Sequence, residues 1–313
     1  MTTTAENRLA ATRPLGQVFA PAKINLALHV VGRRADGYHL LDSLVVFADV
    51  GDTLAASAGA PGFAIDGPFA AGLSAGADNL VRRAEQRFRE RFPALPELTL
   101  RLEKHLPVSS GIGGGSADGA ATLRLLAFLA GGVDGAALAS LAGELGADGP
   151  MCLRSEPLRA RGIGERLDDW GKLPALDLVL VNPGVAVSTP AVFNALARPD
   201  NPPLPEALPT FDNAAALASF LAETSRNDLA TPAKTVAPQI AEAEAAVAAS
   251  AGCLLARMSG SGATVFGLFG DGASARRAAA AIKAARPDWW VVATTTLAPG
   301  RAQPRGPAET VGH

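Results

Sequence analysis

Glycine is concentrated in one short segment, Gly111-Ile-Gly-Gly-Gly-Ser116, which lies between a predicted strand and a predicted helix. Glycines let a backbone approach a ligand closely and turn successive N–H groups toward it. The following helix adds unpaired N–H groups and the positive end of its dipole. We therefore interpret the segment as a phosphate-binding loop, in which the Ser116 hydroxyl can contact a phosphate or a metal held by it. The alternative is a glycine-rich turn that only lets the strand and the helix pack.

The segment differs from two common nucleotide-binding loops. A Walker A loop ends in Gly-Lys followed by Ser or Thr, and this sequence has no such end. A dinucleotide-binding loop reads G-x-G-x-x-G, but Ser116 stands at the third glycine position. Asp134 lies at a suitable distance for a ribose contact, yet in a glycine-flanked turn instead of at the end of a second strand. The sequence thus predicts a phosphate loop of another kind.

Three other segments carry polar residues that packing alone does not explain. Lys23 and Asn25 fall on one face of a predicted strand, although both are poor strand formers, so this face is either a site or an ordinary solvated surface. Asp148 lies in a glycine-flanked turn after a predicted helix, where an isolated Asp usually serves the turn. Residues 257–263 form a second glycine loop between strands, for which a simple hairpin is an equal alternative.

The elements that must position these residues alternate between strands and helices in both halves of the chain. Alternating or continuous apolar patterns predict strands over 18–31, 40–50, 98–104, 176–181, 253–258, 264–269 and 289–296, with short ones around Leu54 and Phe63. Helical patterns are found over 80–92, 117–130, 135–145, 189–196, 213–224, 238–250 and 273–285. Asp78 is the predicted N-cap of the first helix, and Gly51-Asp52 are expected to end the second strand.

These patterns predict an α+β protein of two domains, over 1–170 and 171–300. Residues 1–16 are expected to be a frayed segment and 301–313 a disordered tail.

Composition excludes several classes of protein. The 313 residues include 28 basic and 30 acidic side chains, a net charge of −2 that argues against a nucleic-acid binder. No apolar stretch approaches the roughly 18 residues of a membrane span, and the N-terminus lacks the apolar core of a secretory signal. The two cysteines and four histidines show no spacing typical of a disulfide framework or a metal site. We therefore expect a cytoplasmic enzyme that binds neither nucleic acid nor membrane.

Together these segments resemble the GHMP kinases, the family that includes galactokinase and the homoserine, mevalonate and phosphomevalonate kinases. Pro21-Ala-Lys-Ile-Asn-Leu26 is similar to the first motif of the family, the loop at 107–116 to its second, and Ser259-Gly-Ser-Gly262 to its third. The resemblance covers residues 18–296. It implies an N-terminal ribosomal-protein-S5-like α/β domain, a C-terminal ferredoxin-like α+β domain and an active site in the cleft between them.

A narrower resemblance points to one branch of this family. The segments 32–39 (GRRADGYH), 146–148 (GAD) and 162–165 (GIGE) are similar to the kinases that phosphorylate, with ATP, the 2-hydroxyl of a cytidine diphosphate ester of methylerythritol in the non-mevalonate route to isoprenoid precursors. Other members lack the Asp-Gly-Tyr-His segment. The alternatives are another GHMP-type kinase for a mevalonate- or homoserine-like alcohol, and a catalytically inactive nucleotide sensor, against which the presence of both Lys23 and Asp148 argues.

The resemblance implies roles for individual residues. Asp148 matches the catalytic base that takes the proton of the substrate hydroxyl, and Lys23 matches the cation beside it, which favours the charged carboxylate and can stabilise the attacking oxygen. Tyr38, the only tyrosine, and His39 are expected to hold the cytosine while Phe193 stacks on its other side. The full set of predicted substrate-binding residues is Asn25, Tyr38, His39, Thr189 and Phe193. The predicted ATP-binding residues are Asn79, Lys104, Pro107, Gly111, Gly113, Gly114, Gly115 and Ser116.

The resemblance also implies the other components of the reaction. ATP and Mg²⁺ are the expected cofactors, and the sequence assigns no residue to the metal. The expected partner is the small-molecule substrate alone, bound by a monomer or a homodimer. Arg159 and Arg161 stand where smaller or acidic residues are frequent, so they either meet a diphosphate or are surface charge.

Overall fold

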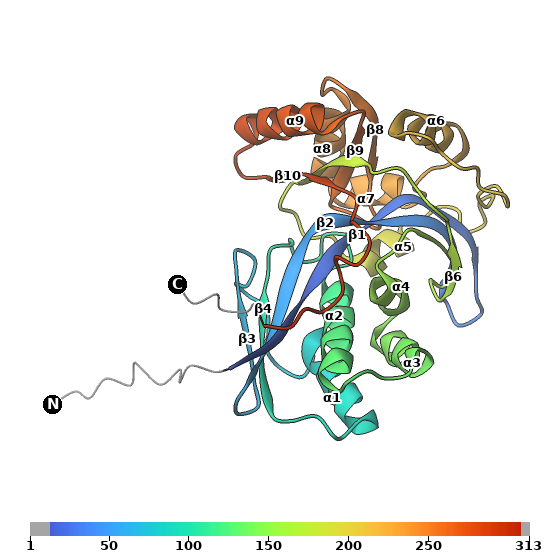
Figure 1. The fold of residues 1–313 in the computed structure, drawn as a ribbon. Coiled ribbons are helices and arrows are strands. Elements are labelled where there is room, and N and C mark those ends of the chain that lie inside the picture. Colours follow the sequence, from blue (N-terminus) through green and yellow to red (C-terminus); the bar gives the residue numbers. More distant parts are fainter. Residues whose placement is uncertain (1–12, 308–313) are drawn as a thin grey trace.

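Over residues 13–307, which the computed structural model describes, the chain forms two β-sheets flanked by helices (Figure 1). The strands are β1 Pro14–Arg33, β2 His39–Ala58, β3 Gly62–Asp66, β4 Leu98–Glu103, β5 Leu158–Gly162, β6 Arg166–Asp169, β7 Asp177–Asn182, β8 Cys253–Met258, β9 Val265–Phe269 and β10 Trp290–Thr295. The helices are α1 Leu80–Arg91, α2 Gly114–Leu129, α3 Gly135–Leu145, α4 Gly149–Arg154, α5 Thr189–Asn194, α6 Ala214–Thr224, α7 Ala230–Val236, α8 Gln239–Ala248 and α9 Gly272–Ala285. The predicted α+β class is confirmed.

The first sheet has the strand order β3-β4-β2-β5-β6, and β1 pairs antiparallel with β2. Helices α1 to α4 lie together in the lower half of the molecule in Figure 1. Apolar residues of the sheet, such as Phe47 and Leu100, pack with Phe88 of α1 and Leu123 of α2 in one buried cluster. Burial of these side chains is the main force that holds the helices on the sheet.

The second sheet has the order β10-β7-β9-β8. Numbered along the chain, these strands run 4-1-3-2, the ferredoxin-like arrangement that the resemblance implies. Alternate side chains of β9 point to opposite faces of this sheet. Both faces are covered by packed residues. Val265 and Phe269 pack in the cluster that includes residues of α8 and α9, whereas Phe266 and Leu268 pack in the cluster that includes residues of β1 and β2.

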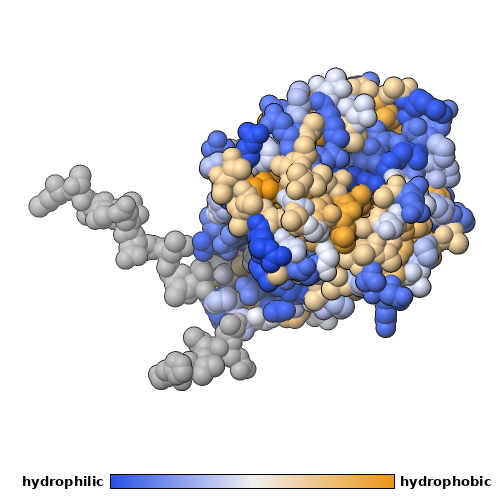
Figure 2. Space-filling model, turned by 90° about the horizontal axis from the view of Figure 1, so that it is seen from above, coloured by the Kyte–Doolittle hydropathy of each residue, from blue (hydrophilic) through white to orange (hydrophobic). Residues whose placement is uncertain are grey.

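Seen from above, the surface mixes hydrophilic areas with pale-orange areas of moderate hydropathy (Figure 2). The helices in the upper half of Figure 1, α6, α8 and α9, are rich in alanine, whose small apolar side chain suits close packing of a helix on a sheet. None of the helices within residues 13–307 is long and apolar enough to cross a membrane.

The strand β2 does not end at Gly51-Asp52, as predicted, but continues through both residues. A Cβ atom at position 51 would lie 2.2 Å from the carbonyl oxygen of Ala20, so only glycine allows this approach of β1. The carboxylate of Asp52 accepts hydrogen bonds from the backbone N–H groups of His105 and Leu106, at 2.6 and 2.8 Å. Gly51 therefore allows the close packing of β1 on β2, and Asp52 holds the loop after β4, although both residue types are typical of turns.

The N-cap of α1 is Asn79, so the prediction of Asp78 is wrong. Asn79 Oδ1 accepts a hydrogen bond from the N–H of Val81 at 2.9 Å, while Nδ2 donates to the carbonyl of Ser74. The Asp78 carboxylate instead accepts from the Ser74 hydroxyl. The short helices α4 and α7 were not predicted, because their few residues show too little of the 3.6-residue period, whereas α5, as short as α4, was expected within 189–196.

Both predicted terminal tails are wrong where the structure describes them. Residues 301–307 lie against the first sheet, because Arg305 exchanges two backbone hydrogen bonds with Gln17 of β1, at 2.9 and 2.8 Å. The strand β1 itself begins at Pro14, inside the segment that was expected to fray. The remaining parts of both predicted tails, residues 1–12 and 308–313, lie outside the described residues.

Candidate active site

Most of the predicted site residues line one cavity of about 620 Å³. The residues come from both halves of the chain, since β1, the glycine loop and α4 belong to the first half and α5 to the second. The predicted residues on its wall are Lys23, Asn25, Asn79, Lys104, Pro107, Gly111, Gly113, Gly114, Gly115, Ser116, Asp148, Thr189 and Phe193. Tyr38 and His39 do not line the cavity.

The glycine loop leads directly into α2, which begins earlier than predicted, at Gly114. Gly113 is the N-cap in a left-handed conformation, with φ of 66°, and no side chain caps the helix. The N–H groups of Gly114, Gly115 and Ser116 are therefore not bonded within the helix and stand at the positive end of its dipole. Because these residues line the cavity, the loop has the geometry of an anion site and is more than a packing turn.

The three motifs meet at the hydroxyl of Ser259. Ser259 Oγ accepts a hydrogen bond from the N–H of Asn25 and donates one to the carbonyl of Gly111, each at 3.1 Å. A Cβ atom at position 111 would lie 2.6 Å from the carbonyl oxygens of Ser259 and Gly262, so the two glycine loops are in close contact. The loop at 257–263 is therefore part of the site wall and not only a hairpin turn.

Lys23 and Asp148 form an ion pair on the cavity wall, with 2.7 Å between Lys23 Nζ and Asp148 Oδ2. The Lys23 side chain is 7% exposed and that of Asp148 is 35% exposed. Asp148 is the N-cap of α4, but its carboxylate makes no capping hydrogen bond, so it is available to the lysine and to the cavity. Burial, followed by the charge of Asp148, raises the pKa of the nearby Cys152 thiol to about 12, which leaves that group neutral.

Lys104 lies under the glycine loop in a buried ion triad. Its Nζ is 2.6 Å from Asp52 Oδ2 and 2.5 Å from Asp118 Oδ2. Burial alone would lower the pKa of Lys104, but the two carboxylates raise it, so the ammonium stays charged. Burial raises the pKa of Asp118, in spite of the lysine beside it. The triad lies beside Gly114 at the start of α2, and its Lys104 and Asp118 line the cavity. A direct contact of Lys104 with a nucleotide stays a prediction.

The aromatic residues are arranged differently from the predicted sandwich. The rings of His39 and Phe193 stack directly on each other, with centroids 4.8 Å apart and an interplanar angle of 23°. Two stacking distances of about 3.5 Å would be needed for a base between them. Tyr38 is 60% exposed. A cytosine held between His39 and Phe193 therefore requires one of the two rings to move.

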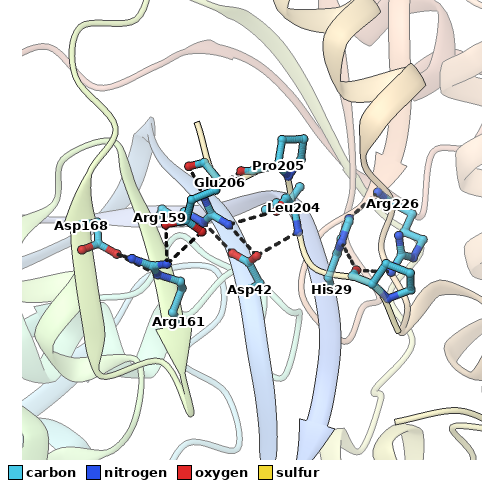
Figure 3. A network of polar contacts seen from close by, with 10 residues as sticks. His29, Asp42, Arg159, Arg161, Asp168, Leu204, Pro205, Glu206 and Arg226 are labelled. Atoms are coloured by element: carbon cyan, nitrogen blue, oxygen red, sulfur yellow. Dashed lines mark hydrogen bonds and ion pairs between the residues drawn. The ribbon is translucent and has the colours of Figure 1, made fainter. Parts of the chain in front are cut away.

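Arg159 and Arg161 do not line the cavity, and Figure 3 shows where their guanidinium groups are held. Arg159 is buried and makes two hydrogen bonds to the Asp42 carboxylate, at 2.8 and 2.7 Å, and others to backbone carbonyls of residues 204–206. Arg161 is 27% exposed and pairs with Asp168 and Glu206. Arg159 is thus an internal clamp for the segment before α6, and neither arginine faces a ligand in the cavity.

Ser261, Asp118 and Ser43 are among the residues on the cavity wall that were not predicted. Ser261 belongs to the third motif, and its Oγ lies 2.8 Å from Oγ1 of Thr189. The resemblance of that motif was a usable signal, although no residue of it was assigned a role. Asp118 lies two residues after the end of the glycine loop, and this short spacing could have indicated that it belongs to the site. Ser43 lies inside an apolar strand, where no pattern distinguishes it from a core residue.

The chain is similar to known proteins over most of its length. Residues 79–156 match the model of the GHMP kinases N terminal domain, and residues 206–288 match that of the GHMP kinases C terminal domain. The chain is 56% identical to a protein of Cereibacter sphaeroides over 88% of this chain and 97% of the relative. It is 54% identical to a protein of Paracoccus denitrificans over 90% of this chain and 97% of the relative. Both relatives are named 4-diphosphocytidyl-2-C-methyl-D-erythritol kinase.

Solved structures show the same likeness. A crystal structure of 4-(cytidine 5'-diphospho)-2C-methyl-D-erythritol kinase is 36% identical, with a TM-score of 0.74 over 90% of this chain and all of that one. A homoserine kinase from Cytophaga hutchinsonii is 19% identical, with a TM-score of 0.65 over 97% of this chain and 99% of its own, which shows the fold alone.

Proposed function

The chain belongs to the 4-diphosphocytidyl-2-C-methyl-D-erythritol kinases of the GHMP kinase family, and we propose that the cavity residues carry out this phosphoryl transfer in the way that follows. ATP is the phosphate donor, and the acceptor is the 2-hydroxyl of the methylerythritol unit. The reaction serves the non-mevalonate route to isoprenoid precursors. A mevalonate- or homoserine-like activity, the alternative considered from the sequence, has less support, because the relatives at 54–56% identity carry the name of the cytidyl enzyme.

The glycine loop holds the phosphates of ATP. The free N–H groups at the start of α2 donate to phosphate oxygens, and the Ser116 hydroxyl adds a further donor. These donors are placed before the ligand arrives, so little reorganisation opposes the transfer. Asn79 has both side-chain groups engaged at the start of α1, so its contribution to nucleotide binding is through the position of that helix.

Asp148 and Lys23 act on the substrate hydroxyl. The Asp148 carboxylate takes the hydroxyl proton as the oxygen attacks the γ-phosphorus of ATP, and the bond from that phosphorus to the bridging oxygen of ADP breaks. The Lys23 ammonium stabilises the negative charge that develops on the attacking oxygen. The observation that carries the proposal is the Lys23–Asp148 pair of 2.7 Å, on the wall of the same cavity that the glycine loop lines.

Mg²⁺ fits this site as a companion of the nucleotide. Within residues 13–307 no cluster of three His, Cys, Asp or Glu residues could hold a metal ion alone. Mg²⁺ is usually bound by one or two protein oxygens, substrate phosphates and water. The Ser116 hydroxyl and Asp118 Oδ1, which is buried with no hydrogen-bond partner among the described residues, are the oxygens that would hold it. When bound, the ion neutralises charge on the phosphates.

The substrate occupies the part of the cavity lined by Asn25, Thr189 and Phe193. Phe193 offers an aromatic face to the cytosine, and His39 and Tyr38 approach the base once the direct stacking of His39 on Phe193 opens. We place the domain boundary near residue 170, because the first sheet ends with β6 and the second begins with β7. A cytoplasmic monomer or homodimer stays our prediction.

A substrate panel tests the proposed function. The purified protein is given ATP with 4-diphosphocytidyl-2-C-methyl-D-erythritol, mevalonate or homoserine in separate reactions, and ADP release and product mass are measured. We expect ATP-dependent phosphorylation of the cytidyl substrate, with mevalonate and homoserine at the background rate. Preference for either of the other alcohols would show that the substrate assignment is wrong.

A further inference from the structure

Asn25 of β1 and Ser43 of β2 form a buried polar contact at the cavity wall. Asn25 is 4% exposed and Ser43 is 2% exposed, and both line the cavity. Asn25 Nδ2 donates to Ser43 Oγ at 2.8 Å, and Ser43 Oγ donates to the carbonyl of Ala27 at 2.6 Å. Asn25 Oδ1 is buried and has no hydrogen-bond partner among the described residues.

The hydroxyl of Ser43 decides which way the Asn25 amide points. A serine hydroxyl has one proton, and the carbonyl of Ala27 can only accept, so that proton is used there. Ser43 Oγ can then only accept from Asn25, and the amide must turn its NH₂ group toward the serine. The orientation of the amide therefore follows from the chain of donors, and Oδ1 is the atom left for another partner.

The remaining oxygen has a definite chemical preference. The backbone of Asn25 is held by the hydrogen bond from its N–H to Ser259 Oγ, and the side chain by Ser43, so Oδ1 cannot easily turn away. A buried acceptor without a partner is unfavourable until a donor reaches it. It attracts a hydroxyl or N–H group and repels a phosphate oxygen. Asn25 lies two residues after Lys23 on β1, and it lines the same cavity as the Lys23–Asp148 pair.

We propose that Ser43 is a positioning residue that fixes Asn25 as a hydrogen-bond acceptor for a hydroxyl group of the substrate's methylerythritol unit. The proposal rests on the proposed function and adds what this position recognises. Without the Ser43 hydroxyl, the Asn25 amide is free to turn its NH₂ group into the cavity, where it no longer accepts from a hydroxyl. Ser43 thus contributes to substrate recognition through Asn25, and nucleotide binding does not depend on it.

The test compares Ser43→Ala with Ser43→Thr, which keeps the hydroxyl, in steady-state kinetics with 4-diphosphocytidyl-2-C-methyl-D-erythritol and ATP. We expect Ser43→Ala to raise the substrate KM about tenfold, the equivalent of one lost hydrogen bond, and to change the ATP KM by less than about twofold. Ser43→Thr keeps the hydroxyl, so its substrate KM should stay within about threefold of that of the unchanged protein. In a protein that already carries Asn25→Ala, the Ser43→Ala change should raise the substrate KM by less than about twofold more, because both changes act through one contact.

Three outcomes would overturn the proposal. The first is an unchanged substrate KM in Ser43→Ala, and the second is an equal rise of the substrate KM and the ATP KM. The third is a double variant whose substrate KM rises by the full product of the Ser43→Ala and Asn25→Ala effects. If Ser43→Ala does not fold, Ser43→Cys replaces it, because a thiol keeps the shape of the side chain but is a weak donor and acceptor. Failure of the proposed function is distinguishable, since the unchanged protein would then not phosphorylate the cytidyl substrate at all.

Discussion

Replacing Asp148 by Asn removes the proposed base and keeps the shape of its side chain. Asp148 Oδ2 accepts a hydrogen bond from Lys23 Nζ at 2.7 Å, and an asparagine oxygen in that place can accept the same bond. We therefore expect Asp148→Asn to lower the free energy of unfolding by only about 1 kcal/mol. Asp148→Ala leaves the buried lysine without its partner. Breaking a fully buried ion pair lowers the free energy of unfolding by about 3–5 kcal/mol. Because Asp148 is partly exposed, we expect a loss of about 1–3 kcal/mol for Asp148→Ala.

The effect on catalysis is expected to be much larger than the effect on stability. A positioned acid–base group typically contributes about 10²–10⁴-fold, or about 3–5 kcal/mol of barrier. Asparagine cannot take the proton, so kcat of Asp148→Asn should fall by about 10²–10⁴-fold. In the proposed site the glycine loop, and not Asp148, holds the nucleotide, so the Kd for ATP should change by less than about twofold.

Three measurements check this prediction, namely kcat from ADP release, the Kd for ATP from titration calorimetry, and the free energy of unfolding from urea titration. Asp168→Asn is the matched control, because Asp168 is a half-exposed carboxylate that also pairs with a cation, Arg161, but lies outside the cavity. The control should keep its kcat. A kcat of Asp148→Asn within about tenfold of the unchanged protein would exclude Asp148 as the base.

Three further predictions concern residues around the site. Tyr38→Ala should raise the KM for the cytidyl substrate far more than that for ATP in steady-state assays, and equal effects would remove its role at the cytosine. Arg159→Met should lower the free energy of unfolding in urea by about 3–5 kcal/mol, because it leaves the buried Asp42 carboxylate without its cation. Arg161 is more exposed, so Arg161→Met should lower the same free energy by less than about 1 kcal/mol. Similar losses in the two variants would contradict the role of Arg159 as a clamp. Burial lowers the pKa of His29, so the unfolded chain takes up a proton before the folded chain does as the pH falls. The free energy of unfolding should therefore fall as the pH drops below about 6.5. Urea titrations between about pH 7 and 5 should show a smaller fall in His29→Gln, and an identical fall would refute the assignment.

The local parts of the site were predictable, because their signals lie close together in the chain. A glycine-rich run between a strand and a helix indicates an anion loop, and the structure places 111–116 in that arrangement. The pairing of Lys23 with Asp148 could not come from spacing, since 125 residues separate them. It came from the resemblance of their two motifs to a family in which both residues share a site. The contact itself depends on where α4 packs, which no local pattern records.

Other predictions failed because a residue's usual local role was overridden by tertiary contacts. Gly51 and Asp52 look like a turn, but β1 packs so closely on Gly51 that only glycine fits, and Asp52 is used inside the protein for Lys104. Residues 301–307, rich in polar and turn-forming types, were expected to be disordered. Backbone pairing of Arg305 with Gln17 holds them instead. Such pairing depends on geometry and leaves no periodic pattern in the sequence.

The charges around the cavity explain how a protein with a net charge of −2 can bind two anionic ligands. Lys23 is balanced by Asp148, and Lys104 lies between two carboxylates, so neither cation is a free attractant for phosphate. Among the protein's own groups, those at the start of α2 that are left for phosphate carry partial charge, namely the N–H groups and the dipole of that helix. Such groups act only over short distances and in fixed directions. In the proposed mechanism Lys104 therefore supports the loop, Lys23 acts beside the base, and the glycine backbone binds the phosphates.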